Sequence, residues 1–523
     1  MSNNLNWCIR INMFKQILRK SFTIGTATFI SRILGFVRDV LIAFFFGTGY
    51  GAQAFVVAFR LPNIWRSFVG EEAVNAAVVP VLSEYRAKED LDNFKSLSKS
   101  LIKSSAFILI LITVGGVFFA PLLIKLIAPG FIADIQKYVL SVKLTRVIFP
   151  YVFLIGLTAM VAGIAISQRI FWSYSWASAA LNISIISSIL FLGRRYGVYA
   201  LAFGIIIGGI IELLMQFFAI RGKGIYRAKA RMFHPEYGRI WKLLLPRFLG
   251  AGVYQVSIFI DTILASLQSI VGSGAIAALY YAQRFVQLPL AVFATSLATA
   301  ALPFFSARRT KNESASIGDN LILSLRFVAF IMIPATFGFF ILAKEIISVV
   351  FQHGSFSSYS TAITSSALRF YALGLLFYAG IKILVVTFYS MQDTLTPVKI
   401  SIISLAINIV GSVALMFSMK ISGLCLATSF AASCNFTLLF LALNKKIKFY
   451  NKNFIIGILK ILLCSVIMAG TLLFTKKLFF ENISSDILAL ISLISLSIFA
   501  YLLSSLFINN EDLRKFIWCS KKE

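Results

Sequence analysis

The sequence predicts an all-α polytopic membrane protein with about 14 transmembrane helices. Of the 523 residues, 59% are hydrophobic and only 13% are charged, whereas roughly 25% of the residues in a soluble domain are charged. Apolar runs of about twenty residues recur along the chain, and this length crosses a hydrocarbon core roughly 30 Å thick. These observations exclude a soluble enzyme, a disordered chain and a disulfide scaffold.

Each apolar window predicts one helix. The expected spans are 21–46, 52–83, 104–128, 145–167, 174–193, 198–220, 243–268, 275–305, 321–343, 361–390, 397–418, 421–443, 454–475 and 486–508.

Lys and Arg are concentrated in the segments that this assignment places in the cytoplasm, with seven of them between Arg221 and Lys242. The positive-inside rule then predicts that both termini, a 1–20 extension and a 509–523 tail, are cytoplasmic. The net charge of +29 therefore needs no nucleic acid to explain it.

The chain resembles itself at an offset of 223 residues, which aligns the second and eighth spans without a gap. At this offset the same residue type recurs at five positions: Gly51 and Gly274, Ala77 and Ala300, Pro80 and Pro303, Ser83 and Ser306, and Arg86 and Arg309. Apolar helices resemble one another by chance, but a shared Pro and Ser at one spacing argue against that alternative. We expect a parallel repeat, with an N-lobe at 21–220, a basic loop at 221–242, a C-lobe at 243–443 and an additional helix pair at 454–508. Parallel repeats place the substrate at the lobe interface and work by rocking one lobe against the other.

Charged residues lie inside the first, second and eighth spans, where each costs at least roughly 2.5–3.5 kcal/mol. Five are basic and three are acidic: Arg32, Arg38, Arg60, Arg66 and Arg284 against Asp39, Glu71 and Glu72. Internal pairs, such as Arg38 with Asp39, would only hold helices together. Because the arginines outnumber the acids, an anionic ligand is the better explanation. The planar guanidinium fork matches phosphate oxygens, so we predict a phosphate- or diphosphate-bearing substrate.

The motifs SRILGFVRD at 31–39, LPNIWR at 61–66, YYAQRFVQLP at 280–289 and YSMQDTLTPVK at 389–399 resemble the MurJ/MviN family. These proteins are lipid II flippases of the multidrug/oligosaccharidyl-lipid/polysaccharide exporter superfamily. The resemblance implies that the substrate is lipid II, an undecaprenyl-diphosphate-linked peptidoglycan precursor, which moves from the cytoplasmic to the periplasmic leaflet of the bacterial inner membrane. It also implies a diphosphate site formed by Arg32, Arg38, Arg66 and Arg284, with Asp39, Asn63 and Glu71 close by. The 454–508 helix pair would form a groove for the prenyl tail.

The resemblance further implies a sodium site at Asp261, Asn408 and Thr428. Ser412 replaces an acid expected there, and a plain polar contact is the alternative for Asp261. No GxxxxGK[ST] loop is present, so nucleotide-driven transport is not expected. The membrane potential, an ion gradient or downstream consumption of the transported substrate would supply the energy, and no other cofactor is expected.

We expect a transporter rather than an enzyme. The two histidines, His234 and His353, fall in loops, and the five cysteines show no CxxC spacing, so neither indicates a catalytic or metal centre. The alternatives are a flippase for another polyprenyl-linked glycan, a multidrug exporter, a non-transporting membrane scaffold with a degenerate cavity, and a membrane-embedded glycosyl- or phosphotransferase. We expect a monomer whose partners are lipid II, membrane lipids and the cell-wall synthesis machinery.

Overall fold

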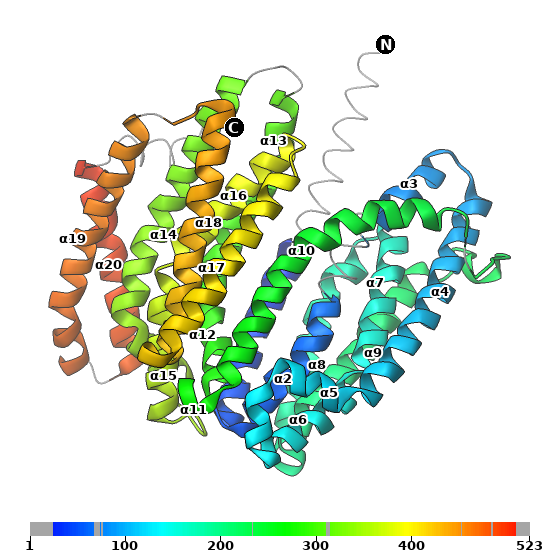
Figure 1. Ribbon diagram of the computed structural model, residues 1–523, viewed down its shortest axis with the longest axis horizontal. Coiled ribbons are helices and arrows are strands. Elements are labelled where there is room, and N and C mark those ends of the chain that lie inside the picture. The colour runs from blue at the N-terminus through cyan, green and yellow to red at the C-terminus, as the bar shows by residue number, and fades with distance from the viewer. Residues whose placement is uncertain are drawn as a thin grey trace. The chain divides into compact units, whose positions relative to one another are not determined.

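The computed structural model describes residues 25–66, 74, 77–232, 234–309, 314–450, 452–482 and 485–508. Within these ranges every regular element is a helix (Figure 1). Residues 25–46 form the first described helix. The longer helices that follow are α2 Tyr50–Trp65, α3 Val79–Ala87, α4 Leu91–Phe118, α5 Ala120–Ile127, α6 Ile135–Ile148, α7 Tyr151–Ser167, α8 Trp172–Tyr196, α9 Tyr199–Ile220, α10 Tyr237–Ser266, α12 Ala275–Pro289, α13 Thr295–Arg309, α14 Ser314–Phe351, α15 Ser358–Ala372, α16 Leu375–Ser390, α17 Leu395–Met419, α18 Ile421–Ile447, α19 Lys452–Asn482 and α20 Asp486–Ile508.

The predicted class, an all-helical membrane protein, is confirmed. Ten helices in the described ranges are long and apolar enough to cross a membrane, or eleven if the bent pair α15 and α16 is one span. The expected spans at 21–46 and 52–83 include residues outside the described ranges. The expected single span at 361–390 is instead broken, because α15 and α16 meet at an angle of 46°.

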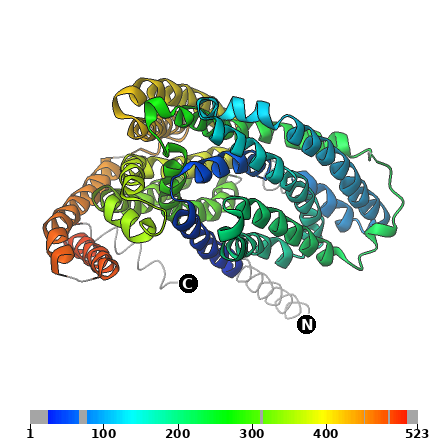
Figure 2. The same ribbon diagram turned by 90° about the horizontal axis from the view of Figure 1, so that it is seen from below.

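The chain divides into two compact units, Met1–Val256 and Ser257–Glu523, and the division falls inside α10. In the first unit, α9 packs against α6, α7 and α8. In the second unit, α19 and α20 pair with each other and both contact α14 (Figures 1 and 2).

The helix boundaries confirm the internal repeat. Ile135 begins α6 and Ser358 begins α15, and Trp172 begins α8 and Leu395 begins α17. Each pair of numbers differs by 223, the offset read from the sequence. The repeat therefore extends beyond the second and eighth spans without an insertion at these helix starts.

The connecting turns repeat as well. After α7, the backbone N–H groups of Arg169 and Ile170 donate to Ile166 and Ala165. After α16, those of Gln392 and Asp393 donate to Tyr389 and Phe388 in the same pattern. Arg169 has φ 64° and Gln392 has φ 60°, the left-handed conformation that commonly ends a helix.

Asp393 anchors the second of these turns. Its carboxylate accepts hydrogen bonds from the backbone N–H of Thr396 at 3.0 Å and from the Thr396 hydroxyl at 2.7 Å, and it pairs with Lys446 at the end of α18. Burial alone would raise the pKa of Asp393, but the hydrogen bonds from Lys446 and Thr396 outweigh it and lower the pKa to about 2. The carboxylate therefore stays ionised and holds α17 and α18 together at this end.

Gly197 and Lys420 also occupy equivalent turn positions. Gly197 has φ 55° and ψ −135°, and Lys420 has φ 53° and ψ −132°. This is the first central position of a type II′ turn, where glycine is the favoured residue. A lysine side chain is strained there, because its Cβ crowds the backbone.

Replacing Lys420 with glycine should stabilise the protein by about 1 kcal/mol, since residues in sparsely populated backbone regions cost of order 1–3 kcal/mol each. Thermal unfolding of the detergent-solubilised protein measures the change. Gly197→Ala is the matched control and should destabilise the first unit, because it introduces the strain that Lys420→Gly removes. A lower melting temperature for Lys420→Gly would contradict the assignment of strain to this turn.

Candidate substrate site

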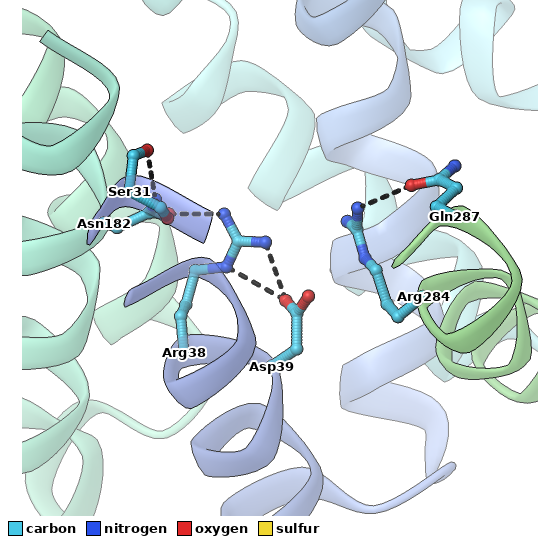
Figure 3. Close-up of polar contacts among 6 residues, drawn as sticks. All are labelled: Ser31, Arg38, Asp39, Asn182, Arg284 and Gln287. Atoms are coloured by element: carbon cyan, nitrogen blue, oxygen red, sulfur yellow. Dashed lines mark hydrogen bonds and ion pairs between the residues drawn. The ribbon is translucent and has the colours of Figure 1, made fainter. Parts of the chain in front are cut away.

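Arg38 is held by two polar neighbours inside the first unit (Figure 3). Its Nε and Nη2 donate to Oδ1 of Asp39 at 3.0 and 2.7 Å, and its Nη1 donates to Oδ1 of Asn182 on α8 at 2.9 Å. Asn182 in turn donates to the backbone oxygen of Ser31 at 3.0 Å. Asp39 is only 2% exposed, so the internal pair weighed from the sequence does form. The pair compensates the Arg38 charge and fixes the direction of its guanidinium.

A second buried polar pair lies in the same unit. The hydroxyl of Tyr151 on α7 donates to the carboxylate of Glu212 on α9 at 3.3 Å. Arg66, at the end of α2, interacts electrostatically with both of these residues, and Arg38 also acts on Tyr151. Arg38 and Arg66 therefore bring positive charge to one buried hydroxyl–carboxylate pair.

The other predicted residues of the first unit differ in their setting. Arg32 lies in the first described helix and is exposed, and Asn63 is exposed near the end of α2. Glu71 lies outside the described residues. The structure thus joins Arg38 directly to Asp39, and both Arg38 and Arg66 act electrostatically on Tyr151.

Arg284 belongs to the second unit. Its guanidinium lies over the ring of Tyr280, 4.3 Å from the ring centre. Its Nη1 donates to Oε1 of Gln287 at 3.4 Å (Figure 3). Pro289 ends α12, and the helix continues as a wider π-helical turn over Leu290–Ala294. Such turns accommodate the hydrogen bond that a proline cannot make and are frequent at functional sites.

The three residues of the expected sodium site also lie in the second unit. Nδ2 of Asn408 on α17 donates to Oγ1 of Thr428 on α18 at 3.1 Å. Oδ1 of Asn408 and the hydroxyl of Ser412 are buried and have no hydrogen-bond partner among the described residues. Asp261 is 7% exposed and interacts electrostatically with Cys425, one turn from Thr428. Asn408 and Thr428 are therefore in contact, and their oxygen atoms are of the type that a hard cation prefers.

An apolar pocket of about 370 Å³ lies among α14, α19 and α20. Phe330, Pro334, Leu472 and Ile498 are among the residues that line it. Because Pro334 has no N–H group, the helix cannot supply the usual hydrogen bond to the carbonyl four residues earlier, that of Phe330. The Tyr501 hydroxyl on α20 donates to this oxygen at 2.7 Å. A side chain of the C-terminal helix pair thus satisfies the acceptor that the proline leaves open.

Removing this hydroxyl with Tyr501→Phe should lower the free energy of unfolding by about 1–2 kcal/mol, because it leaves a part-buried carbonyl without its donor. A double-mutant cycle with Pro334→Ala isolates the effect, since alanine restores the helical N–H. In the Pro334→Ala background, Tyr501→Phe should cost much less. Equal costs in both backgrounds, measured by unfolding in detergent, would contradict this role for Tyr501.

Two residues of this site were missing from the sequence prediction. Glu212 is the only acid in α9, and a lone acid inside a predicted span is a signal that was available at 198–220. Asn182 offered a weaker signal, because a neutral amide is less costly in a membrane than a charge. Both were missed because the charge argument did not extend to the fifth and sixth spans.

The arrangement of helices matches solved membrane transporters. A multidrug resistance MATE family transporter of the MOP superfamily, in an inward-facing conformation, aligns with a TM-score of 0.68 and 13% identity over 80% of this chain and 94% of its own. The two proteins therefore share a fold. A solved lipid II flippase MurJ, in an inward closed conformation, aligns with a TM-score of 0.79 and 29% identity over 93% of this chain and 99% of its own.

Sequence comparison gives the family. The family model for lipid II flippase MurJ matches residues 42–494. A probable lipid II flippase MurJ of Buchnera aphidicola (subspecies Acyrthosiphon pisum) is 32% identical over 87% of this chain and 89% of its own. The corresponding protein of Vibrio cholerae is 30% identical over 94% of this chain and 96% of its own. The chain belongs to the lipid II flippase MurJ family.

Proposed function

We propose that this protein moves lipid II from the cytoplasmic to the periplasmic leaflet of the bacterial inner membrane. Membership of the MurJ family, over residues 42–494, carries the proposal. An excess of arginines in the first, second and eighth expected spans, five against three acids, supports an anionic substrate, because a charge in a membrane needs a compensating partner. Transport proceeds by alternating access, with both termini in the cytoplasm and a monomer as the working unit.

Four arginines bind the diphosphate in this proposal. Arg32, Arg66 and Arg284 supply charge to the phosphate oxygens, and Arg38 presents a guanidinium oriented by Asp39 and Asn182. Asn63 and Glu71 complete the site. The guanidinium group suits this task because its fork of N–H donors matches phosphate geometry.

The prenyl tail follows the apolar surface of the C-terminal helix pair. The pocket among α14, α19 and α20 supports this assignment, because its walls are almost wholly apolar.

The transport cycle is driven by sodium bound at Asp261, Asn408 and Thr428, or by the membrane potential. One elementary charge crossing the field gains about 2.3 kcal/mol per 100 mV.

Replacement of the native flippase in a depletion strain tests this function. The wild-type chain should prevent accumulation of lipid II in the cytoplasmic leaflet, measured by its accessibility to a probe that cannot cross the membrane. At equal membrane abundance, lipid II should still accumulate in the cytoplasmic leaflet of cells that carry Arg32→Ala, Arg66→Ala or Arg284→Ala. Arg194→Ala, at the exposed end of α8, is the matched control and should behave as wild type. Full rescue by all three site variants would contradict the arginine site.

A further inference from the structure

Glu212 is a buried carboxylate that the transport proposal does not use. It is 2% exposed and lies in the middle of α9. One turn further on, Gln216 is fully buried and accepts a hydrogen bond from the Ser173 hydroxyl at 2.8 Å. Glu212 accepts its own hydrogen bond from Tyr151 at 3.3 Å. A carboxylate in such a setting is costly unless a cation compensates it.

Among the described residues, Arg66 is the cation that acts electrostatically on Glu212. On α7, Tyr151 is the only titratable residue. On α6, Lys143 and Arg146 are exposed, and Lys137 faces Asp134 at 3.9 Å. On α8, the titratable residues are all exposed: Tyr174, Arg194, Arg195 and Tyr196. Arg38 acts on Tyr151 but is itself paired with Asp39.

We propose that Glu212 is the counter-ion of Arg66 in the empty carrier and takes up a proton from water when a diphosphate binds Arg66. This inference rests on the proposed function. The physical reason is competition: a diphosphate and a buried carboxylate both draw on the same guanidinium. With the diphosphate bound, the uncompensated negative charge on Glu212 favours its neutral form.

The proton balance is simple. A hydronium ion gives its proton to a carboxylate oxygen of Glu212 and leaves a water molecule, and release of the diphosphate reverses the step. The empty first unit then keeps two matched pairs, Arg38 with Asp39 and Arg66 with Glu212. The occupied unit keeps its charge matched by exchanging the Glu212 carboxylate for the diphosphate.

Binding of farnesyl diphosphate to the purified full chain in detergent tests the inference. Calorimetry in buffers of different ionisation enthalpy gives the number of protons taken up per molecule bound. Glu212→Gln removes the titrating group, and Glu345→Gln is the matched control, because Glu345 pairs with Lys476 at 2.8 Å in the second unit. An infrared difference spectrum of the wild-type protein detects a protonated carboxyl group directly and does not depend on any variant folding.

We expect wild type and Glu345→Gln to take up the same fraction of a proton, and Glu212→Gln to take up less. The affinity of wild type should rise as the pH falls, by at most about tenfold per pH unit for linkage to one proton, and Glu212→Gln should lose that part of the dependence. Tyr151→Phe should alter the carboxyl band without abolishing it. Binding with equal proton uptake in wild type and Glu212→Gln, and with no carboxyl band in wild type, would overturn this inference alone. Absence of diphosphate binding to the wild-type chain would overturn the arginine site and this inference with it.

Discussion

Asp39→Asn should lower the free energy of unfolding by about 3–5 kcal/mol, the usual cost of leaving one member of a buried ion pair without its partner. Asp39 is 2% exposed, and its Oδ1 accepts two hydrogen bonds from Arg38. The asparagine keeps the shape of the side chain but removes the charge that compensates the guanidinium. Thermal and denaturant unfolding of the purified protein in detergent measure the loss.

Two comparisons make this result specific. Glu84→Gln removes an acid from an exposed pair with Arg239, 2.6 Å apart, and should cost less than about 1 kcal/mol because solvent screens such pairs. The double variant Arg38→Gln with Asp39→Asn should regain part of the stability, since no charge is then left unmatched. A double variant less stable than Asp39→Asn alone would show that the pair is not what Asp39 contributes.

Gly423→Ala is the second change with a large expected effect. A Cβ at this position would lie 2.6 Å from the carbonyl carbon of Leu415, so the α17–α18 connection would have to open. Overpacking of this kind typically costs about 1–3 kcal/mol, and we expect the upper end because the obstacle is backbone rather than a flexible side chain. Gly470→Ala on α19, where a Cβ meets nothing within 4 Å, should be neutral or stabilising. Equal melting temperatures for the two variants would contradict this reading of the connection.

Hydropathy alone predicted much of the fold, because a helix that crosses lipid must be apolar along its length. Spans expected at 174–193 and 486–508 correspond to α8 Trp172–Tyr196 and α20 Asp486–Ile508. The bend between α15 and α16 was not predicted, since both sides of the break are apolar.

The charge argument was similarly partial. It identified Arg38 and Asp39, because charged residues in a membrane must have a compensating partner. It could not decide whether Arg38 pairs with Asp39 or binds a ligand. That choice depends on the direction of the Arg38 guanidinium, which Asn182 helps to fix. Glu212 could have been found by extending the same count to every span.

The constant offset of 223 has a consequence for how such a carrier could specialise. At this offset Arg38 corresponds to Asp261, so one position carries a cation in the first half and an anion in the second. A symmetric dimer of a single half must place the same residue at both positions. Joining the halves in one polypeptide removes that constraint, and each copy becomes free to evolve affinity for ions of opposite sign.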